Sequence, residues 1–139
     1  MRKFIARSNG QKQMKPLKQL GIWMDHSIAH LIELSNDKMV KRTLKIAPAF
    51  LGPLENLRLN ESRINNKVND HLSDFYRKLS DVIKGYDQVL LYGPTQAKTE
   101  LFNQLKEDIH FDRIKIDVQP ADKMTDNQQE AYVKRFFDI

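Results

Sequence analysis

Residues 88–102, with the sequence QVLLYGPTQAKTELF, decide the fold of this chain. The apolar run over 88–92 indicates a buried strand, and Gly93-Pro94 ends it. The residues that follow have the apolar spacing of an amphipathic helix, which we predict over 96–107. In open α/β sheets, a turn at the carboxyl edge of a strand is where ligands bind. This turn presents three polar residues there: Thr95, Gln96 and Lys98.

Length and composition limit the possible classes of protein. The chain has 139 residues, is 40% hydrophobic and contains no cysteine. This size predicts one globular domain with a single core. No apolar run approaches the roughly 20 residues that span a bilayer, and the N-terminus lacks the apolar block of a signal peptide, so we expect a cytoplasmic protein. Without cysteine there are no disulfides, thiolate zinc sites or thiol catalysis, and the scattered histidines indicate no metal site; we expect no cofactor and see no pattern for a small-molecule substrate.

Positive charge is concentrated at the N-terminus. Residues 1–19 hold six cations and no acid, against a whole-chain net charge of +5, so the other residues carry about −1. The six are Arg2, Lys3, Arg7, Lys12, Lys15 and Lys18. A basic, flexible arm on a near-neutral body favours a polyanionic partner, most simply RNA phosphates, and the alternative is a solvated tail. The apolar face of this arm is too weak to favour membrane docking.

Residues 20–46 predict three antiparallel strands in a meander. The first two strands meet at Asp25-His26-Ser27, where Asp25 can accept hydrogen bonds from backbone amides of the turn. His26 either closes this hairpin or contacts RNA, and we favour the hairpin. The third strand, over 39–46, alternates apolar and basic side chains, so its lysines should point away from the core.

Residues 47–67 show no regular apolar period. Two prolines and a glycine favour an irregular crossing, and a loop of about twenty residues is usually functional or mobile. Three cations keep the later part basic: Arg58, Arg63 and Lys67. A helix follows, with an apolar stripe from Val68 to Ile83, and ends at Gly85.

The rest of the chain predicts a strand over 112–118 and a helix over 125–137. Thr125 and Gln128 have the spacing of a capping box at the start of that helix. The element order is therefore β-β-β-α-β-α-β-α, and right-handed crossovers would lay the later strands parallel beside the hairpins. We predict a mixed five-stranded α/β sheet with a ribonuclease-H-like layout, formed by a single domain over 20–139. Three aromatic residues should face its core: Trp23, Tyr132 and Phe136.

Three blocks carry a family resemblance: GIWMDHSIA over 21–29, YGPTQAKTEL over 92–101 and DKMTDNQQEAYVKRFF over 122–137. Together they resemble the bacterial proteins often labelled "translational machinery protein". That family is similar to the central, ribonuclease-H-like domain of eukaryotic and archaeal class I release factors and of the ribosome-rescue factor pelota. The resemblance implies a ribosome-associated protein that acts in termination, rescue or hibernation.

The chain departs from release factors at one important motif. Release factors carry Gly-Gly-Gln between the third strand and the first long helix, whereas residues 47–66 contain no such tripeptide and Asn9-Gly10-Gln11 precedes the first strand. We therefore expect neither peptidyl-tRNA hydrolysis nor the codon-reading and partner-binding domains of full release factors. The expected activity is noncatalytic binding to the ribosome or its RNA, in which the arm and the basic residues of 58–67 neutralise phosphates. The 93–98 turn adds a shaped contact.

Two alternatives follow from the same residues. A ribonuclease-H-type nuclease needs carboxylates that converge on paired metals, and Asp25 is a candidate for the first of them. However, the strand over 88–92 contains no acid, and the acids of the first long helix form the pattern of a solvated face: Asp70, Asp74 and Asp81. The second alternative is a small protein-interaction module that can self-associate, because a fold alone does not fix a function.

The turn after the central strand has a structural and a functional interpretation. Gly93 and Pro94 either serve the geometry of a strand-to-helix turn, which we favour, or shape a contact loop. Lys98 lies in the first helical turn, where the helix dipole disfavours a cation, which suggests either an anionic partner such as phosphate or pairing with a carboxylate. We expect an unoccupied surface lysine at this position.

Overall fold

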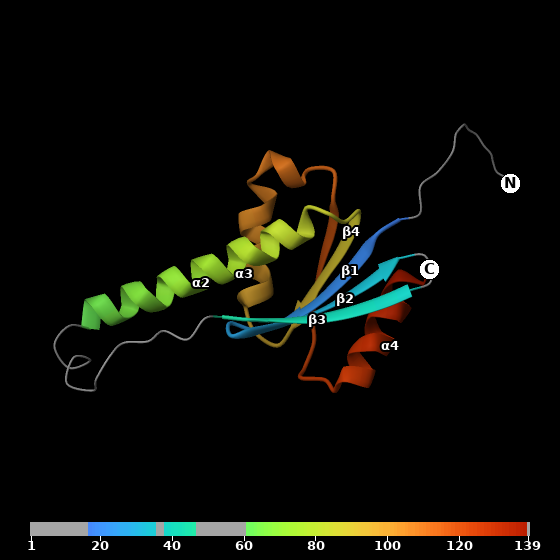
Figure 1. Ribbon diagram of the computed structural model, residues 1–139, viewed down its shortest axis with the longest axis horizontal. Coiled ribbons are helices and arrows are strands. Elements are labelled where there is room, and N and C mark those ends of the chain that lie inside the picture. Colours follow the sequence, from blue (N-terminus) through green and yellow to red (C-terminus); the bar gives the residue numbers. More distant parts are fainter. Residues whose placement is uncertain (1–16, 36–37, 47–60, 139) are drawn as a thin grey trace, which may run out of the picture.

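The computed structural model describes residues 17–35, 38–46 and 61–138, with side chains from residue 70 onward in the last range. These residues form five strands: β1 (Gln19–Met24), β2 (Ile28–Ser35), β3 (Lys38–Lys45), β4 (Gln88–Gly93) and β5 (Lys115–Pro120). They also form three α-helices and one 3-10 helix: α2 (Glu61–Ile83), α3 (Ala97–Lys106), α4 (Asp126–Phe137) and η1 (Ile109–Phe111). The predicted order of strands and α-helices is confirmed (Figure 1).

The strands form one mixed sheet in the order β3-β2-β1-β4-β5. β1 pairs with β2 and β2 with β3 in antiparallel fashion, while β4 lies parallel to both β1 and β5. The helical crossovers that follow β3 and β4 place the later strands parallel beside the meander, as right-handed connections require. The predicted ribonuclease-H-like α/β layout is confirmed.

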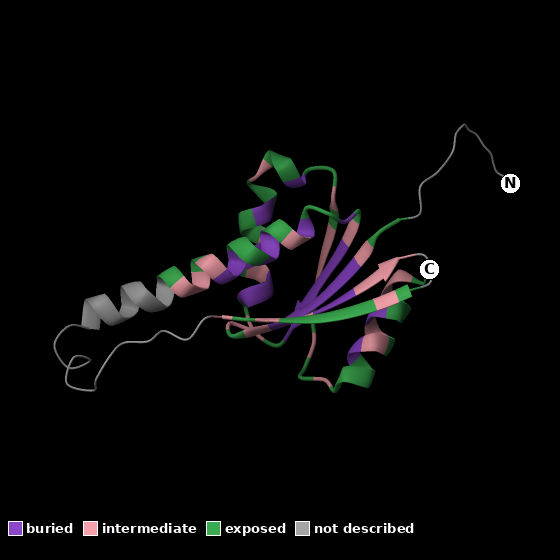
Figure 2. Cartoon of the chain, viewed as in Figure 1, coloured by how far each residue is buried: buried purple, intermediate pink, exposed green. Residues whose placement is uncertain are grey.

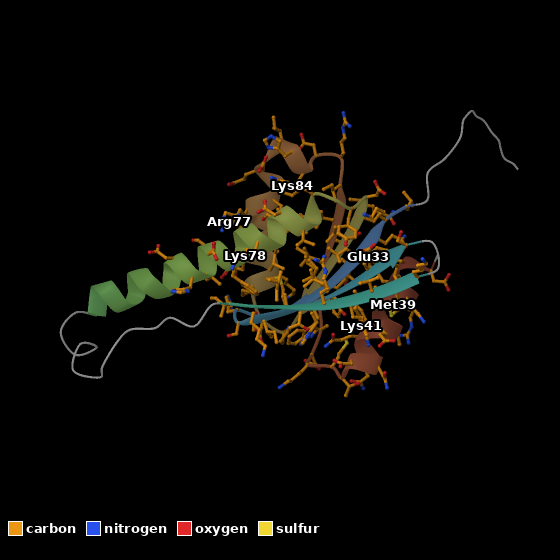
Figure 3. The ribbon with its side chains drawn as sticks, viewed as in Figure 1. Glu33, Met39, Lys41, Arg77, Lys78 and Lys84 are labelled. Atoms are coloured by element: carbon orange, nitrogen blue, oxygen red, sulfur yellow. The ribbon has the colours of Figure 1, made fainter. Side chains whose placement is uncertain are left out.

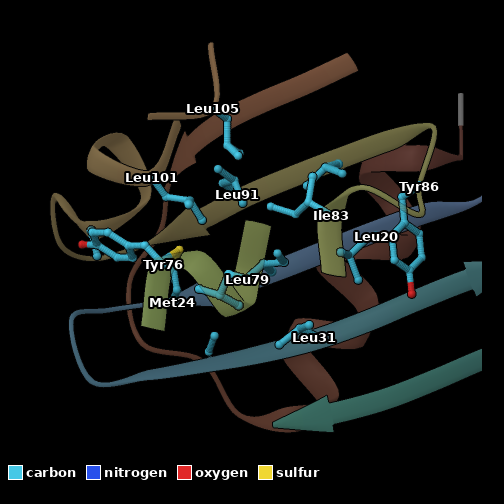
Figure 4. Packing of buried hydrophobic residues seen from close by; sticks show 14 of the residues in the cluster. Leu20, Met24, Leu31, Tyr76, Leu79, Ile83, Tyr86, Leu91, Leu101 and Leu105 are labelled. Atoms are coloured by element: carbon cyan, nitrogen blue, oxygen red, sulfur yellow. The ribbon is translucent and has the colours of Figure 1, made fainter. Parts of the chain in front are cut away.

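α2 and α3 cover one face of the sheet, and this face holds the larger core (Figures 1 and 4). Alternate residues of β1 point into it, since successive side chains of a strand face opposite sides. Burying a large apolar side chain stabilises the fold by about 1.5–3 kcal/mol, so these contacts are the main source of stability. The fully buried members include Leu20, Ile22, Met24, Leu31, Leu79, Ile83, Leu91 and Leu101.

α4 covers the opposite face through a second buried cluster. Val133 of α4 packs directly over Gly21 of β1, where an added Cβ would lie only 2.4 Å from the Val133 Cγ2 atom. The Tyr132 ring stacks on the Tyr92 ring with centroids 4.8 Å apart. The second cluster also includes Trp23 and Phe136, so the inward orientation predicted for the three aromatic residues is confirmed.

Two local predictions at the ends of elements are also confirmed. The Asp25 carboxylate accepts hydrogen bonds from the backbone amides of Ser27, at 2.7 Å, and Ile28, at 2.9 Å, and so fixes the β1–β2 turn. Thr125 and Gln128 form the complete, reciprocal capping box at the start of α4.

Two predicted boundaries are wrong. α2 begins at Glu61 rather than Val68, because residues 61–67 contain no glycine or proline that would end the helix, even though their apolar pattern is weak. β5 covers 115–120 rather than 112–118, since the Asp108 carboxylate accepts a hydrogen bond from the His110 amide and starts the short helix η1. That 3-10 turn occupies residues that would otherwise begin the strand.

Tyr92 places a polar group inside the second buried cluster. Its ring is fully buried, and its hydroxyl has no hydrogen-bond partner among the described residues. Burial, and to a smaller degree the neighbouring Tyr132, raises the pKa of the Tyr92 phenol. The side chain therefore remains neutral in the folded protein at pH values where an unfolded tyrosine ionises.

We predict that Tyr92→Phe leaves the free energy of unfolding at pH 7 unchanged or raises it by about 1 kcal/mol, because the substitution removes an unpaired buried hydroxyl. The stabilisation linked to the raised pKa is complete below about pH 10 and declines as the pH rises above it, by about 1.4 kcal/mol per pH unit for each such tyrosine. Urea denaturation between pH 7 and 11.5 should therefore show a shallower alkaline decline for the variant.

The matched control is Tyr86→Phe. The Tyr86 hydroxyl donates a hydrogen bond to Glu33 at 2.6 Å, and burial together with this bond raises its pKa to about 12. This variant should lose about 1–2 kcal/mol at pH 7, because an acceptor loses its donor. Equal losses in the two variants at pH 7 would contradict the assignment of an unpaired hydroxyl to Tyr92.

Candidate functional site

The candidate site lies where β1 and β4 end side by side and β4 turns into α3. Gly93, the last residue of β4, has a φ of 152°, a backbone conformation that other residues rarely adopt. An added Cβ would lie 2.1 Å from the carbonyl oxygen of Met24 at the end of β1. Glycine is thus required for two strands to end in contact, which favours the structural interpretation of Gly93. Pro94 follows as an exposed residue of the turn.

Thr95 and Gln96 form the start of α3. The Thr95 hydroxyl accepts a hydrogen bond from the Ala97 amide at 3.2 Å, and Gln96 occupies the N-cap position without a capping bond from its side chain among the described residues. Gln96 is exposed and Thr95 is half-buried. The turn therefore offers the Gln96 amide group to solvent at the carboxyl edge of the sheet, as the sequence predicts.

Lys98 differs from the surface lysine that we expected. The residue is only 7% exposed, and its ammonium group donates a hydrogen bond to the Thr95 carbonyl oxygen at 2.5 Å. Its aliphatic stem is buried while the charged end returns to the turn, a common arrangement for long basic side chains. Lys98 therefore holds the turn together and does not project from it.

Glu100 joins three elements at this edge. Its Oε1 atom lies 3.1 Å from His26 Nε2 in the β1–β2 turn and accepts a hydrogen bond of 2.6 Å from the Tyr76 hydroxyl on α2. Burial, followed by the bond to Glu100, raises the pKa of the Tyr76 phenol. His26 thus lies in the β1–β2 turn and reaches α3 from there, while the Asp25 carboxylate bonds the backbone of the hairpin. Sequence reasoning missed Tyr76 and Glu100, which lie 24 residues apart and carry no shared motif.

Three of the four acids considered for a nuclease have other partners: Asp25, Asp74 and Asp81. Asp25 binds the backbone of its own turn. Asp74 accepts a hydrogen bond from Arg77 and pairs with Lys78, and these partners lower its pKa. Within the described ranges, no group of three or more histidine, cysteine or acidic side chains is placed to hold a metal ion. The carboxylates whose contacts are seen therefore serve local structure.

The predicted phosphate-binding residues divide into three groups. Five residues of the arm and one of the crossing lie outside the described residues: Arg2, Lys3, Arg7, Lys12, Lys15 and Arg58. Arg63 and Lys67 belong to α2, so the irregular structure predicted for them is wrong. Lys18 is exposed, and its ammonium lies 5.2 Å from the centre of the Tyr86 ring. The arm predicted over 1–19 overlaps the sheet at its end, because β1 begins at Gln19 and the Lys18 amide bonds Asp87.

The sheet separates the two predicted contact regions. Lys18 precedes β1 and therefore lies at the amino edge, whereas the 93–98 turn lies at the carboxyl edge, roughly 20 Å away along a six-residue strand. α2 runs from the carboxyl edge to the amino edge, since β3 ends at the former and β4 begins at the latter. At 23 residues it is about 35 Å long and extends beyond the sheet, with Arg63 and Lys67 in its first turns (Figure 1).

This arrangement of a 3-2-1-4-5 sheet between two helical layers defines a ribonuclease-H-like α/β domain. Solved structures with a similar fold include Archaeoglobus fulgidus Pelota, with a TM-score of 0.55 and 12% identity over 89% of this chain and 32% of that one. Thermoplasma acidophilum Pelota matches with a TM-score of 0.54 and 10% identity over 86% and 33% of the two chains. The archaeal translation termination factor aRF1 matches with a TM-score of 0.52 and 16% identity over 88% and 35%.

The chain thus spans about a third of the length of each of these proteins, and at these identities the likeness concerns the fold. Neither a protein-family model nor a curated protein matches the sequence. No helix within the described ranges is long and apolar enough to cross a membrane.

The contact between Gly93 and Met24 leads to a prediction about stability. Gly93→Ala should lower the free energy of unfolding by about 3 kcal/mol or more, because the new Cβ would meet backbone and the φ is unfavourable. Gly85→Ala is the control, since its Cβ would lie at an ordinary 3.7 Å from the carbonyl oxygen of Val82. Its effect should stay within about 1 kcal/mol. Urea denaturation of both variants measures the difference, and similar losses would contradict the close approach of β4 to β1.

Proposed function

We propose that this protein acts in translation as a noncatalytic factor that associates with the ribosome or its RNA in the cytoplasm, in termination, rescue or hibernation. The observation that carries the proposal is the fold shared with two archaeal Pelota proteins and with a translation termination factor. The three sequence blocks that resemble bacterial "translational machinery" proteins support it. They form the β1–β2 turn, the β4–α3 turn and α4, and so lie at the centre of this fold.

The absence of Gly-Gly-Gln from the sequence supports a binding role in preference to peptidyl-tRNA hydrolysis. Arginine and lysine bind RNA mainly through phosphates, and this contribution depends on charge and spacing more than on nucleotide sequence. The arm precedes β1, which begins at the amino edge, and the first turns of α2 lie beyond the carboxyl edge, so we assign two such contacts to opposite ends of the domain. The distance between them favours an extended RNA surface such as that of a ribosomal subunit.

The buried contact of Lys98 changes the composition of the proposed interface. Its ammonium is bonded to Thr95 inside the turn, so we assign the contact at the carboxyl edge to the exposed Gln96 with Thr95. Lys98 then acts indirectly, because it fixes the carbonyl of Thr95 and therefore the shape of the turn.

We predict that replacing Lys12, Lys15 and Lys18 together with glutamine makes binding to purified ribosomes less sensitive to salt. Each phosphate contact contributes roughly 0.7–0.9 to the slope of log K against log salt, so the slope should fall by about two units. The measurement is co-sedimentation through sucrose gradients from 50 to 300 mM potassium chloride. A charge-matched control replaces three exposed lysines of the body and should keep the original slope: Lys106, Lys115 and Lys123.

Two results would count against this function. Wild-type protein that remains at the top of the gradient at every salt concentration contradicts stable association with ribosomes. A slope that is the same in the arm variant and in wild type removes the arm from the interface, and the contact must then be sought at α2 and the 93–98 turn.

A further inference from the structure

We propose that β3 is a docking site for an extended acidic peptide segment of another protein, which adds to the sheet as a sixth strand. This inference concerns a different surface from the proposed ribosome contacts and is independent of them. In strand addition, main-chain hydrogen bonds supply affinity, and the hollows that receive alternate side chains supply specificity. The described part of β3 provides both features, and its charge indicates the partner.

The backbone of β3 has one side without a partner strand in the described structure. β3 is the end strand of the sheet and pairs with β2 along all eight of its residues. Just beyond the strand, the Ile46 amide donates a hydrogen bond to the Ser27 carbonyl at 2.8 Å. Because bonded and non-bonded pairs alternate in an antiparallel ladder, Val40, Arg42 and Leu44 then bond to β2. The intervening residues direct their N–H and C=O groups to the outer edge: Met39, Lys41, Thr43 and Lys45.

The helices leave β3 largely uncovered on both faces. Most of its residues are exposed, whereas the neighbouring β2 is mainly buried or half-buried (Figure 2). On the α2 face, a hollow of about 400 Å³ is lined by Leu31, Leu44, Val82, Arg42, Lys78 and Asp81, with Thr43 at its border. On the α4 face, a smaller hollow of about 180 Å³ has a lining that includes His30, Ile32, Lys41, Thr43 and Gln129, with one acid, Asp126. Successive side chains of an added strand point to opposite faces, so they would be directed toward the two hollows in turn.

The charge of β3 selects an acidic partner. Its eight residues include four cations and no acid: Lys38, Lys41, Arg42 and Lys45. Lys78 of α2 lies beside the same strand (Figure 3). Lys41 pairs with Glu130 of α4 at 2.5 Å and Lys78 with Asp74 at 3.2 Å. Among the described residues, three cations of β3 form no ion pair and are left for an acidic partner: Lys38, Arg42 and Lys45. Val40, with 48% of its surface exposed, adds an apolar contact in the middle.

Two other partners could bind at this edge, a second copy of the chain or RNA, and both fit it less well than an acidic peptide. Pairing of two copies through β3 would set lysine and arginine side chains against one another, and lysines on edge strands are a known protection against such pairing. RNA would satisfy the cations but offers no strand ladder to the outward amides. An extended peptide with alternating acidic and aliphatic residues satisfies the backbone groups, the charges and the hollows together.

The test uses the full chain with all six cations of the arm replaced by glutamine, so that the arm does not attract the probe: Arg2, Lys3, Arg7, Lys12, Lys15 and Lys18. The probe is the synthetic peptide acetyl-(Glu-Val)5-amide, and amide hydrogen exchange is measured by NMR with and without it. We expect the Lys41, Thr43 and Lys45 amides to exchange quickly in the free protein and at least tenfold more slowly at saturating peptide. The Val40, Arg42 and Leu44 amides should exchange slowly in both samples, because they bond to β2.

A matched pair of variants isolates the backbone contact. Thr43→Pro removes one outward N–H group and preserves the ladder to β2, a substitution that edge strands tolerate. Thr43→Ala removes the same side chain, including its 3.3 Å contact with His30, but keeps the N–H group. The peptide should bind the proline variant at least tenfold more weakly than the alanine variant, as measured by fluorescence anisotropy. If the proline variant does not fold, the exchange measurement alone decides.

Each of four outcomes would overturn the proposal. Peptide binding without slower exchange at the Lys41, Thr43 and Lys45 amides indicates charge attraction without strand addition. Equal binding of acetyl-(Lys-Val)5-amide indicates no selection for acids. Slower exchange with a uridine decanucleotide in place of the peptide assigns the edge to RNA, and slower exchange in the free protein at high concentration assigns it to a second copy. Since ribosomes are absent from this assay, its result is separate from that of the proposed function.

Discussion

The contact between the ends of β1 and β4 is the constraint on which the rest of the structure depends. β1 is the strand where the antiparallel meander meets the parallel half of the sheet, so it bonds to β2 on one side and β4 on the other. Gly93 lets β4 end against the Met24 carbonyl, and Gly21 lets Val133 of α4 approach β1 from the side. Because these two glycines have no Cβ atom, β4 can end in contact with β1, and α4 can pack closely on the sheet.

That central contact also determines where the polar groups gather. Because β4 ends beside Met24, the β1–β2 turn and the start of α3 lie at the same edge, close enough for His26 to reach Glu100. Tyr76 approaches the same carboxylate from α2. One acceptor thus links a hairpin, a crossover helix and the helix that follows the central strand. Lys98 adds a hydrogen bond within the turn itself, so side-chain hydrogen bonds hold this edge in one conformation.

The features that were predictable from the sequence depend on residues close together in the chain. The Asp25 turn and the Thr125 capping box involve partners within three residues, and the strand over 88–92 has its own apolar run. The strand order followed from the general handedness of crossovers. The role of Glu100 was not predictable, because its bond to His26 joins residues 74 apart. The burial of Lys98 depends on helix packing, which local patterns do not encode.

The order of strands explains why the charged surfaces are separate. The meander begins with β1 at the centre of the sheet, so its third strand, β3, lies at the edge. The helices leave most residues of β3 exposed there. β3 can remain exposed there because its lysines and arginine oppose pairing with like strands. The other edge is shorter, and β5 ends at Pro120, which has no N–H group to offer a partner. The fold therefore leaves its longer edge, with its positive charge, as the side on which another chain can extend the sheet.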